Sequence, residues 1–127
     1  MPYSVSWVQP ERIVLVQIEE LLTTADIRTF SPEAFRLSAS GKAPVHFIVD
    51  IQRLRKIESV ADGLKAIQRT KPHPNTGWMV VVGTLSAPLM LFTDLVSKFT
   101  RVHYIRVDTM PQALTFLWEN DESLAVS

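Results

Sequence analysis

VHFIVD, at residues 45–50, is a nearly unbroken apolar run. Such a short, continuous run is typical of a strand that is covered on both faces, as in the middle of a parallel sheet. GWMVVVG, at residues 77–83, has the same character and predicts a second buried strand. A helical segment separates the two runs, so together they predict an α/β domain with parallel strands.

The flanking segments predict three further strands. Residues 3–9 alternate polar and apolar side chains, Pro10 and Glu11 form a turn signal, and residues 12–18 resume in β-rich sequence. Two strands joined by a short turn predict an antiparallel hairpin. Residues 102–107 predict the last strand. The remaining segments have helical spacing, at residues 23–40, 59–70, 86–99 and 109–120.

Cap and breaker residues give the expected helix ends. Thr24 is the expected N-cap of the first helix, and Gly41 is its expected stop. Pro32 inside it predicts a kink or two short helices. Ser59 with Asp62 resembles a capping box at the start of the second helix.

The expected fold class is therefore α/β, in the order β-β-α-β-α-β-α-β-α, within one domain of residues 1–127. The sheet is mixed, with about five strands: the N-terminal hairpin is antiparallel and the other strands are parallel. Right-handed crossovers connect the parallel strands. We expect the mixed tail at residues 120–127 to fray.

Composition narrows the function classes. Thirteen basic residues balance thirteen acidic ones, which gives no sign of a nucleic-acid partner. Cysteine is absent, so disulfides and thiolate metal sites are excluded, and a cytoplasmic location is expected. The histidines at positions 46, 73 and 103 show no metal-ligand spacing, and no GxSxG nucleophile sequence occurs. We therefore expect no metal, no cofactor and no enzymatic activity.

The N-terminal residues and the apolar stretches are not expected to be secretion or membrane signals. The first six residues lack a basic segment followed by an apolar run, so no signal peptide is expected. The most apolar stretches, residues 78–82 and 85–92, are interrupted by Gly83, Thr84 and Ser86, and are too short to span a bilayer.

VDIQRLRKIES, at residues 49–59, adds a family resemblance. With the strand order and the hairpin start, this segment makes nearly the whole chain similar to the STAS domains, and to their SpoIIAA-like, anti-sigma-factor-antagonist-like branch. The resemblance implies a non-catalytic regulatory or protein-interaction module. It also implies a protein partner, such as a kinase or another regulatory protein.

In signalling members of that family, a strand ends in Asp, and an Ile-Asp-Ser-type step then opens a helix whose Ser or Thr is phosphorylated. Here the strand is expected to end at Asp50, and the step reads Ile57-Glu58-Ser59. The resemblance therefore makes Ser59 a candidate phosphoacceptor, although Val60-Ala61 replaces the family's Ser or Thr and Gly. From the residues alone, Ser59 is a helix cap, worth roughly 1 kcal/mol. The two roles are compatible.

The expected partner or ligand surface lies at the carboxyl ends of the parallel strands, where open α/β sheets bind ligands. A basic loop at residues 53–56 is expected to form part of it. The residues assigned to this surface are Asp50, Arg53, Arg55, Lys56, Glu58, Thr84 and Ser86.

The helix expected at residues 86–99 is apolar over most of its circumference. One stripe suits the core, at Leu85, Leu89, Phe92, Val96 and Phe99. A second apolar set lies beside it, at Pro88, Met90, Leu91 and Leu95. The second set either packs against the helix of residues 109–120, whose own Trp118 is expected to face inward, or forms an exposed patch. An exposed patch would serve a homodimer, or it would bind a small apolar or lipid-like ligand, which is the alternative function.

Overall fold

The computed structural model describes residues 3–69 and 71–126. Its strands are β1 (Tyr3–Gln9), β2 (Ile13–Leu22), β3 (Val45–Ile57), β4 (Thr76–Val82) and β5 (Tyr104–Val107). Its helices are α1 (Thr24–Ala39), α2 (Val60–Gln68), α3 (Ala87–Thr100) and α4 (Met110–Asn120), followed by the short 3-10 helix η1 (Glu122–Val126). Within this part of the chain, no helix combines the length and the apolar character needed to cross a membrane.

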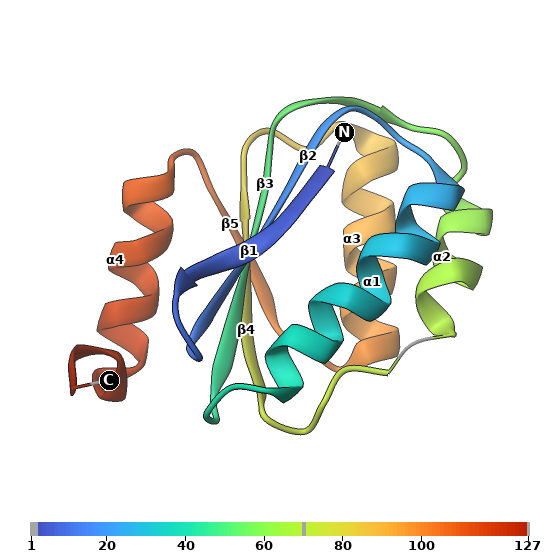
Figure 1. Ribbon diagram of the computed structural model, residues 1–127. Coiled ribbons are helices and arrows are strands. Elements are labelled where there is room, and N and C mark those ends of the chain that lie inside the picture. The colour runs from blue at the N-terminus through green and yellow to red at the C-terminus, as the bar shows by residue number, and fades with distance from the viewer. Residues whose placement is uncertain (1–2, 70, 127) are drawn as a thin grey trace.

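The five strands lie in the sheet in the order of the sequence. β1 is antiparallel to β2, and the pairs β2–β3, β3–β4 and β4–β5 are parallel. Each parallel connection moves the chain one strand in the same direction, and such connections are right-handed. α1, α2 and α3 therefore lie on one face of the sheet, whereas α4 lies on the other (Figure 1). The predicted fold class, a mixed α/β sheet with a hairpin start, is confirmed.

β3 is covered on both faces, as its continuous apolar sequence predicts. Val45 and Phe47 point into the core beneath α1, α2 and α3. Ile48 points into the second core, which α4 covers. That second core joins strand residues to the C-terminal segment through Ile13, Ile48, Val80, Val82, Ala113, Leu117 and Leu124.

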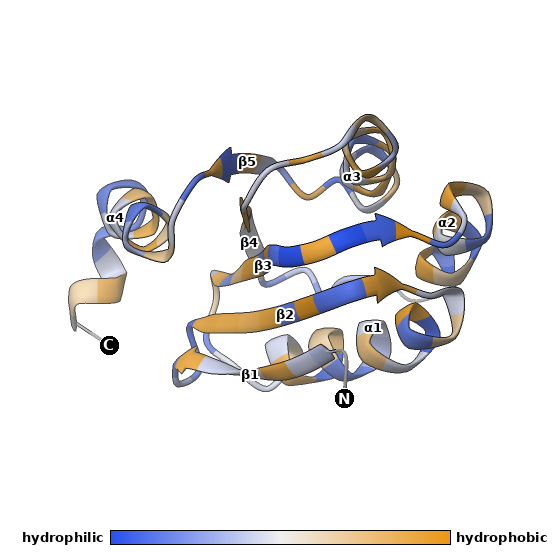
Figure 2. Cartoon of the chain, turned by 90° about the horizontal axis from the view of Figure 1, so that it is seen from above, coloured by the Kyte–Doolittle hydropathy of each residue, from blue (hydrophilic) through white to orange (hydrophobic). Residues whose placement is uncertain are grey.

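β2 and β3 are longer than expected. The basic segment at residues 53–56, predicted as a loop, is part of β3, and the strand does not end at Asp50. β2 continues beside it, so that Glu19 aligns with Arg53 and Leu22 with Ile57. The prediction failed because the charged side chains of this segment face solvent, while Leu54 and Ile57 pack against the core. Figure 2 shows this change from apolar to hydrophilic residues along β3.

Pro32 was expected to give a kink or two short helices, and the second alternative is wrong, because α1 is one helix. Its N-cap is Thr23, whose side chain accepts the N–H of Asp26 at 3.0 Å, rather than Thr24. Pro32 is exposed, while Phe30 before it and Ala34 after it are buried. The burial of these side chains on one side of the helix stabilises it enough to offset the loss of the one backbone hydrogen bond that a proline removes.

The C-terminal segment is docked, and the expectation that it frays is wrong for the residues described. Leu124 is buried in the core that α4 covers. Trp118, by contrast, was expected to face inward and is exposed on α4. The buried residues of α4 are Ala113 and Leu117, four positions apart, and Trp118 lies to one side of that stripe.

Replacing Leu124 by Ala should lower the free energy of unfolding by about 2–4 kcal/mol, because it empties a buried leucine site. The matched control is Glu122→Ala, an exposed position in the same short helix, which should stay within about 0.5 kcal/mol of the parent. Urea denaturation measures both. Equal effects of the two substitutions would show that the tail is not docked.

Candidate functional site

The helices α1, α2 and α3 begin at the edge of the sheet where the parallel strands end (Figure 1). Ser59 lies at this carboxyl edge as the N-cap of α2, in an extended conformation. Its Oγ accepts the backbone N–H of Asp62 at 3.1 Å, and the residue is half-buried. The predicted capping role of Ser59 is confirmed, and the hydroxyl lies at the positive end of the α2 dipole.

Glu58, the neighbour of Ser59, binds the N-terminus of a different helix, α1. Its Oε1 accepts the backbone N–H of Thr24 at 3.1 Å, and its own N–H donates to the carbonyl of Leu22 at 2.9 Å. A carboxylate at the start of α1 is electrostatically favourable. Glu58 therefore holds the ends of β2 and β3 to the start of α1.

The basic residues of β3 lie beside acidic residues of β2. Arg53 pairs with Glu19 at 3.7 Å, and Arg55 pairs with Glu20 at 3.3 Å. Both arginine side chains are 80% exposed, so these ion pairs add little to stability. Lys56 is also exposed. The ends of β2 and β3 thus form a ribbon that presents both signs of charge to solvent.

Asp50 belongs to a polar row across the sheet rather than to a strand end. Its Oδ1 accepts the backbone N–H of Gln52 at 3.0 Å, and its Oδ2 accepts Nε2 of Gln17 at 3.4 Å. Gln17 in turn accepts the hydroxyl of Ser4 at 3.3 Å. Asp50, Gln17 and Gln52 line a shallow polar depression with Arg53.

Thr84 and Ser86 occupy the turn from β4 into α3, and both are exposed. Ser86 is the N-cap of α3, yet its side chain makes no capping hydrogen bond. Gly83 begins this turn with φ of +128°, which favours glycine. Its carbonyl accepts Nη1 of Arg106 at 3.0 Å. Thr84 and Ser86 therefore lie at the same edge of the sheet as Ser59.

The second apolar set of α3 lies mostly on the surface. Pro88, Met90 and Leu91 are exposed, and Leu95 is half-buried. Phe99, which was expected in the core stripe, is 57% exposed. Of the two alternatives for this set, packing against the helix at residues 109–120 is wrong, because α4 covers the opposite face of the sheet and α3 packs against α2.

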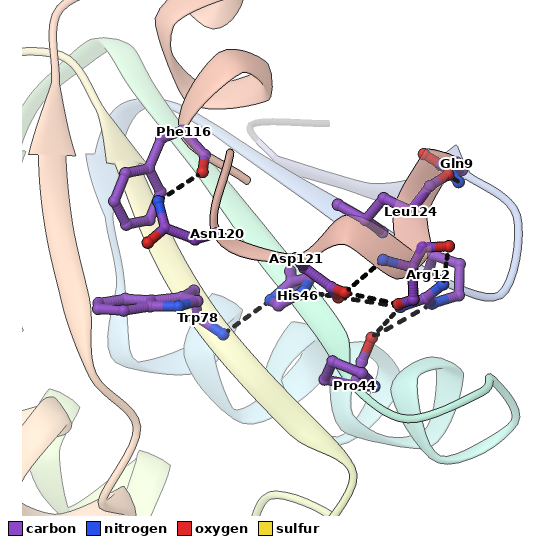
Figure 3. A network of polar contacts seen from close by, with 10 residues as sticks. Gln9, Arg12, Pro44, His46, Trp78, Phe116, Asn120, Asp121 and Leu124 are labelled. Carbon is purple, nitrogen blue, oxygen red and sulfur yellow. Dashed lines mark hydrogen bonds and ion pairs between the residues drawn. The ribbon is translucent and has the colours of Figure 1, made fainter. Parts of the chain in front are cut away.

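A buried polar cluster that was not predicted from the sequence lies at the opposite, amino-terminal edge of the sheet (Figure 3). Asp121, just after α4, is its centre. Its Oδ2 accepts a hydrogen bond from Nη2 of Arg12 at 3.0 Å and another from Nε2 of His46 at 2.8 Å. Arg12 also donates to the carbonyls of Pro44 and Ser123. The cluster therefore fastens the C-terminal segment to β2 and β3.

The tautomer of His46 follows from its two partners. The backbone N–H of Trp78 donates to Nδ1 at 2.9 Å, so the ring proton of the neutral form is on Nε2 and is donated to Asp121. Burial lowers the pKa of His46, although the Asp121 carboxylate opposes this effect. Burial alone would raise the pKa of Asp121, but hydrogen bonds from Ser123 and His46 outweigh it and hold that pKa below its ordinary value.

This cluster has the residue types of a catalytic triad but not its geometry. The hydroxyl of Ser123 donates to Asp121 rather than to His46, and both ring nitrogens of His46 are occupied. Across residues 3–69 and 71–126, no group of three histidine or acidic side chains is placed to hold a metal ion. The signal that could have revealed the cluster is His46 itself, a polar residue inside a buried apolar strand.

Comparison with solved structures shows that the chain has a SpoIIAA-like fold, which confirms the predicted resemblance. It is similar to an uncharacterized DUF3478-family protein from Shewanella loihica PV-4, with a TM-score of 0.62, 18% identity and 91% of each chain covered.

Two further neighbours are SpoIIAA structures. For the anti-sigma factor antagonist SpoIIAA in its unphosphorylated form, the TM-score is 0.61 and the identity 11%, over 92% of this chain and 96% of that one. For the Bacillus cell fate determinant SpoIIAA in its phosphorylated form, the values are 0.51 and 12%, over 91% and 98%. Neither the protein-family models nor the curated proteins give a match. At sequence identities this low, the comparisons show that the structures share a fold.

The stability of the protein should fall as the pH drops below the ordinary histidine pKa of 6.5. The pKa of His46 is lowered in the folded state, so the unfolded chain takes up a proton first as the pH falls. We expect the free energy of unfolding to decrease from pH 7 to pH 5 in urea titrations. His46→Asn should show a smaller decrease. Identical slopes for the parent and this variant would contradict the assignment.

Ser59→Ala should lower the free energy of unfolding by about 1 kcal/mol, because it removes the side-chain acceptor of the Asp62 N–H. Ser86→Ala is the matched control. It alters the N-cap of α3, whose side chain makes no such bond, and should change stability by less than about 0.5 kcal/mol. Thermal and urea denaturation compare the two variants. A larger loss in Ser86→Ala would argue against the capping role of Ser59.

Proposed function

We propose that this protein is a non-catalytic regulatory or protein-interaction module whose partner contacts the carboxyl edge of the sheet around Ser59. The observation that carries this proposal is the position of Ser59, a half-buried hydroxyl at the N-terminus of α2, in a SpoIIAA-like fold. Two structural neighbours are described as SpoIIAA in its unphosphorylated and phosphorylated forms. A cytoplasmic location suits a chain without cysteine.

Ser59 is the proposed phosphoacceptor. A phosphate at a helix N-terminus is stabilised by free backbone N–H groups and by the helix dipole. Phosphate oxygens on Ser59 could take over the Asp62 N–H that Oγ accepts now. The next residue but one, Ala61, is exposed and small, which leaves room for a kinase to approach.

The ribbon at the ends of β2 and β3 is the proposed recognition surface beside Ser59. It offers Arg53, Arg55 and Lys56 as cations, with Glu19 and Glu20 among them. The exposed ion pairs are weak, so a charged partner can replace them at little cost. A protein partner with complementary charges, a kinase or another regulatory protein, fits this surface. Glu58, Thr84 and Ser86 complete the proposed edge, and Asp50 lies inside β3, in the polar row beside Gln17.

The outer face of α3 is the proposed contact for a second copy of the chain. Met90, Leu91 and Phe99 are large apolar side chains that are about half exposed. Pro88 and Leu91 are three positions apart and Leu95 follows four later, so they lie along one side of the helix. Exposed apolar surface of this kind is typical of an interaction site.

The second candidate function is binding of a small apolar or lipid-like ligand. A specific observation favours it: α3 turns its inner side toward a partly open apolar cavity between the helices and the sheet. Cavities of this kind are common ligand sites.

Partner capture from cells that produce the protein tests the first function. The unmodified full chain should retain a specific protein partner, Ser59→Ala should retain it too, and Ser59→Asp should lose it because the added charge imitates phosphate. Thr115→Asp, at an exposed position of α4 on the other face of the sheet, is the control and should behave like the parent. Mass spectrometry of the same samples should find phosphate on Ser59. The proposal is overturned if no form of the protein retains a partner.

A further inference from the structure

β5 is an edge strand, because it stands last in the order of the strands across the sheet. Figure 2 shows it at the margin of the sheet, between α3 on one side and α4 on the other. Its register with β4 is unbroken from Tyr104 to Val107, and it contains no proline. The opposite edge strand, β1, has a bulge between Trp7 and Gln9. Bulges and prolines keep edge strands from pairing, so β5 is the edge whose backbone permits a further strand.

The outward backbone groups of β5 belong to Tyr104 and Arg106. The carbonyls of His103 and Val107 accept N–H groups from β4 and from the residue just after it, at 2.9 and 3.0 Å. In a parallel pair, successive residues turn their N–H and C=O groups alternately toward and away from the neighbouring strand. Ile105 and Val107 therefore bond to β4, whereas Tyr104 and Arg106 turn both backbone groups away from it.

The side chains of these two residues lie on the face of the sheet that α3 covers, because residues two apart in a strand share a face. The hydroxyl of Tyr104 donates to Oδ1 of Asp94 on α3. Nη1 of Arg106 donates to the carbonyl of Gly83 at 3.0 Å and to Asp108 at 2.8 Å. The Arg106 side chain is 41% exposed, so its pair with the exposed Asp108 is weak. β5 thus carries an anion beside Tyr104 and an exchangeable cation two residues further on.

A two-fold axis at Ile105 would pair β5 with β5 of a second copy in antiparallel orientation. In this register, Tyr104 of one copy lies opposite Arg106 of the other, and the two residues exchange backbone N–H···O=C bonds. Side chains directly opposite each other in such a pair have Cβ atoms about 5 Å apart. The guanidinium of one copy can therefore lie along the Tyr104 ring of the other and reach its Asp94 carboxylate.

Apolar surface on both faces of the sheet is complementary about the same axis. On the face that α4 covers, Ile105 is half-buried and would lie opposite Ile105 of the other copy. On the other face, Met90 precedes Asp94 by one helical turn, so it lies on the side of α3 that faces β5. Met90 is 49% exposed, and pairing of the strands would bring the two α3 helices together over it.

We propose that two copies of this chain associate through β5, with Arg106 of each copy bound to Tyr104 and Asp94 of the other. The inference rests on the proposed second-copy contact at α3 and specifies its geometry. The arrangement is closed, because both copies use the same surface, as in most homodimers. It leaves the ribbon at the ends of β2 and β3 free for another partner, because β4 lies between β3 and β5.

Hydrogen exchange followed by NMR tests the pairing in the unmodified full chain, and light scattering measures the mass in the same samples. Concentrated samples should contain a dimer in which the N–H groups of Tyr104 and Arg106 are protected from exchange. Dilution to the monomer should speed their exchange at least tenfold. The N–H groups of Ile105 and Val107 bond to β4, so they are the internal control and should stay protected in both states.

Arg106→Pro should raise the dimer dissociation constant at least tenfold, because it removes the outward N–H and the cation but no bond to β4. Arg106→Asp should have a similar effect, and adding Asp94→Arg should recover the dimer, because the two charges are exchanged. Phe99→Gln is the matched control and should dimerise like the parent. Phe99 is 57% exposed and lies on the opposite side of α3 from Met90, since nine residues at about 100° each bring the helix half a turn round.

A parent chain that is monomeric at every concentration overturns the inference together with the proposed second-copy contact. A dimer in which the N–H groups of Tyr104 and Arg106 exchange freely overturns the inference alone. The same conclusion follows if Phe99→Gln breaks the dimer and the Arg106 variants do not.

Discussion

The handedness of the parallel connections determines most of this structure. β2, β3, β4 and β5 advance across the sheet in one direction, so three right-handed crossovers place α1, α2 and α3 on the same face. That face acquires a thick core and the cavity. In the part of the chain that the structure describes, α4 and the C-terminal segment cover the other face (Figure 1). The unequal coverage explains why the polar row of Ser4, Gln17 and Asp50 lies on the solvated part of the sheet.

The thinly covered face depends on the buried cluster around Asp121. Arg12, His46 and Asp121 would be costly to bury singly, because ionised and polar groups lose their hydration. Together they satisfy one another, and the backbone groups of Trp78, Pro44 and Ser123 complete the set. The cluster lies at the amino edge of the sheet, opposite Ser59. The polar residues that stabilise the fold around Asp121 therefore lie at the opposite edge of the sheet from the proposed partner surface around Ser59.

Local sequence patterns predicted the fold well, because each strand and helix shows its own periodicity and the connection rules supply the topology. The Ser59 cap was predictable for the same reason, since its partner Asp62 is three residues away. The extension of β3 was missed because several basic residues at the end of a strand resemble a loop, and the pairing with Glu19 and Glu20 is not local.

Features that depend on packing could not be predicted from the sequence. His46 and Asp121 are 75 positions apart, and no local spacing links them. The surplus apolar surface of α3 was evident in the sequence. The helix against which α3 packs could not be predicted, because the order of the strands does not by itself say which face of the sheet α4 covers. The cavity arises only when α1, α3 and the sheet are placed together.

The two proposed functions share structural elements, which bears on how a regulatory module of this fold would work. Leu85 lines the cavity and lies between Thr84 and Ser86 at the partner edge. Ile67 lines it from α2, the helix that Ser59 caps. A molecule in the cavity would therefore contact both helices whose N-termini form the edge. Because a ligand shifts a conformational equilibrium only through contacts that differ between its states, coupling between the two proposed functions would require contacts of this kind, and Leu85 and Ile67 are lining residues on the elements that lead to the partner edge.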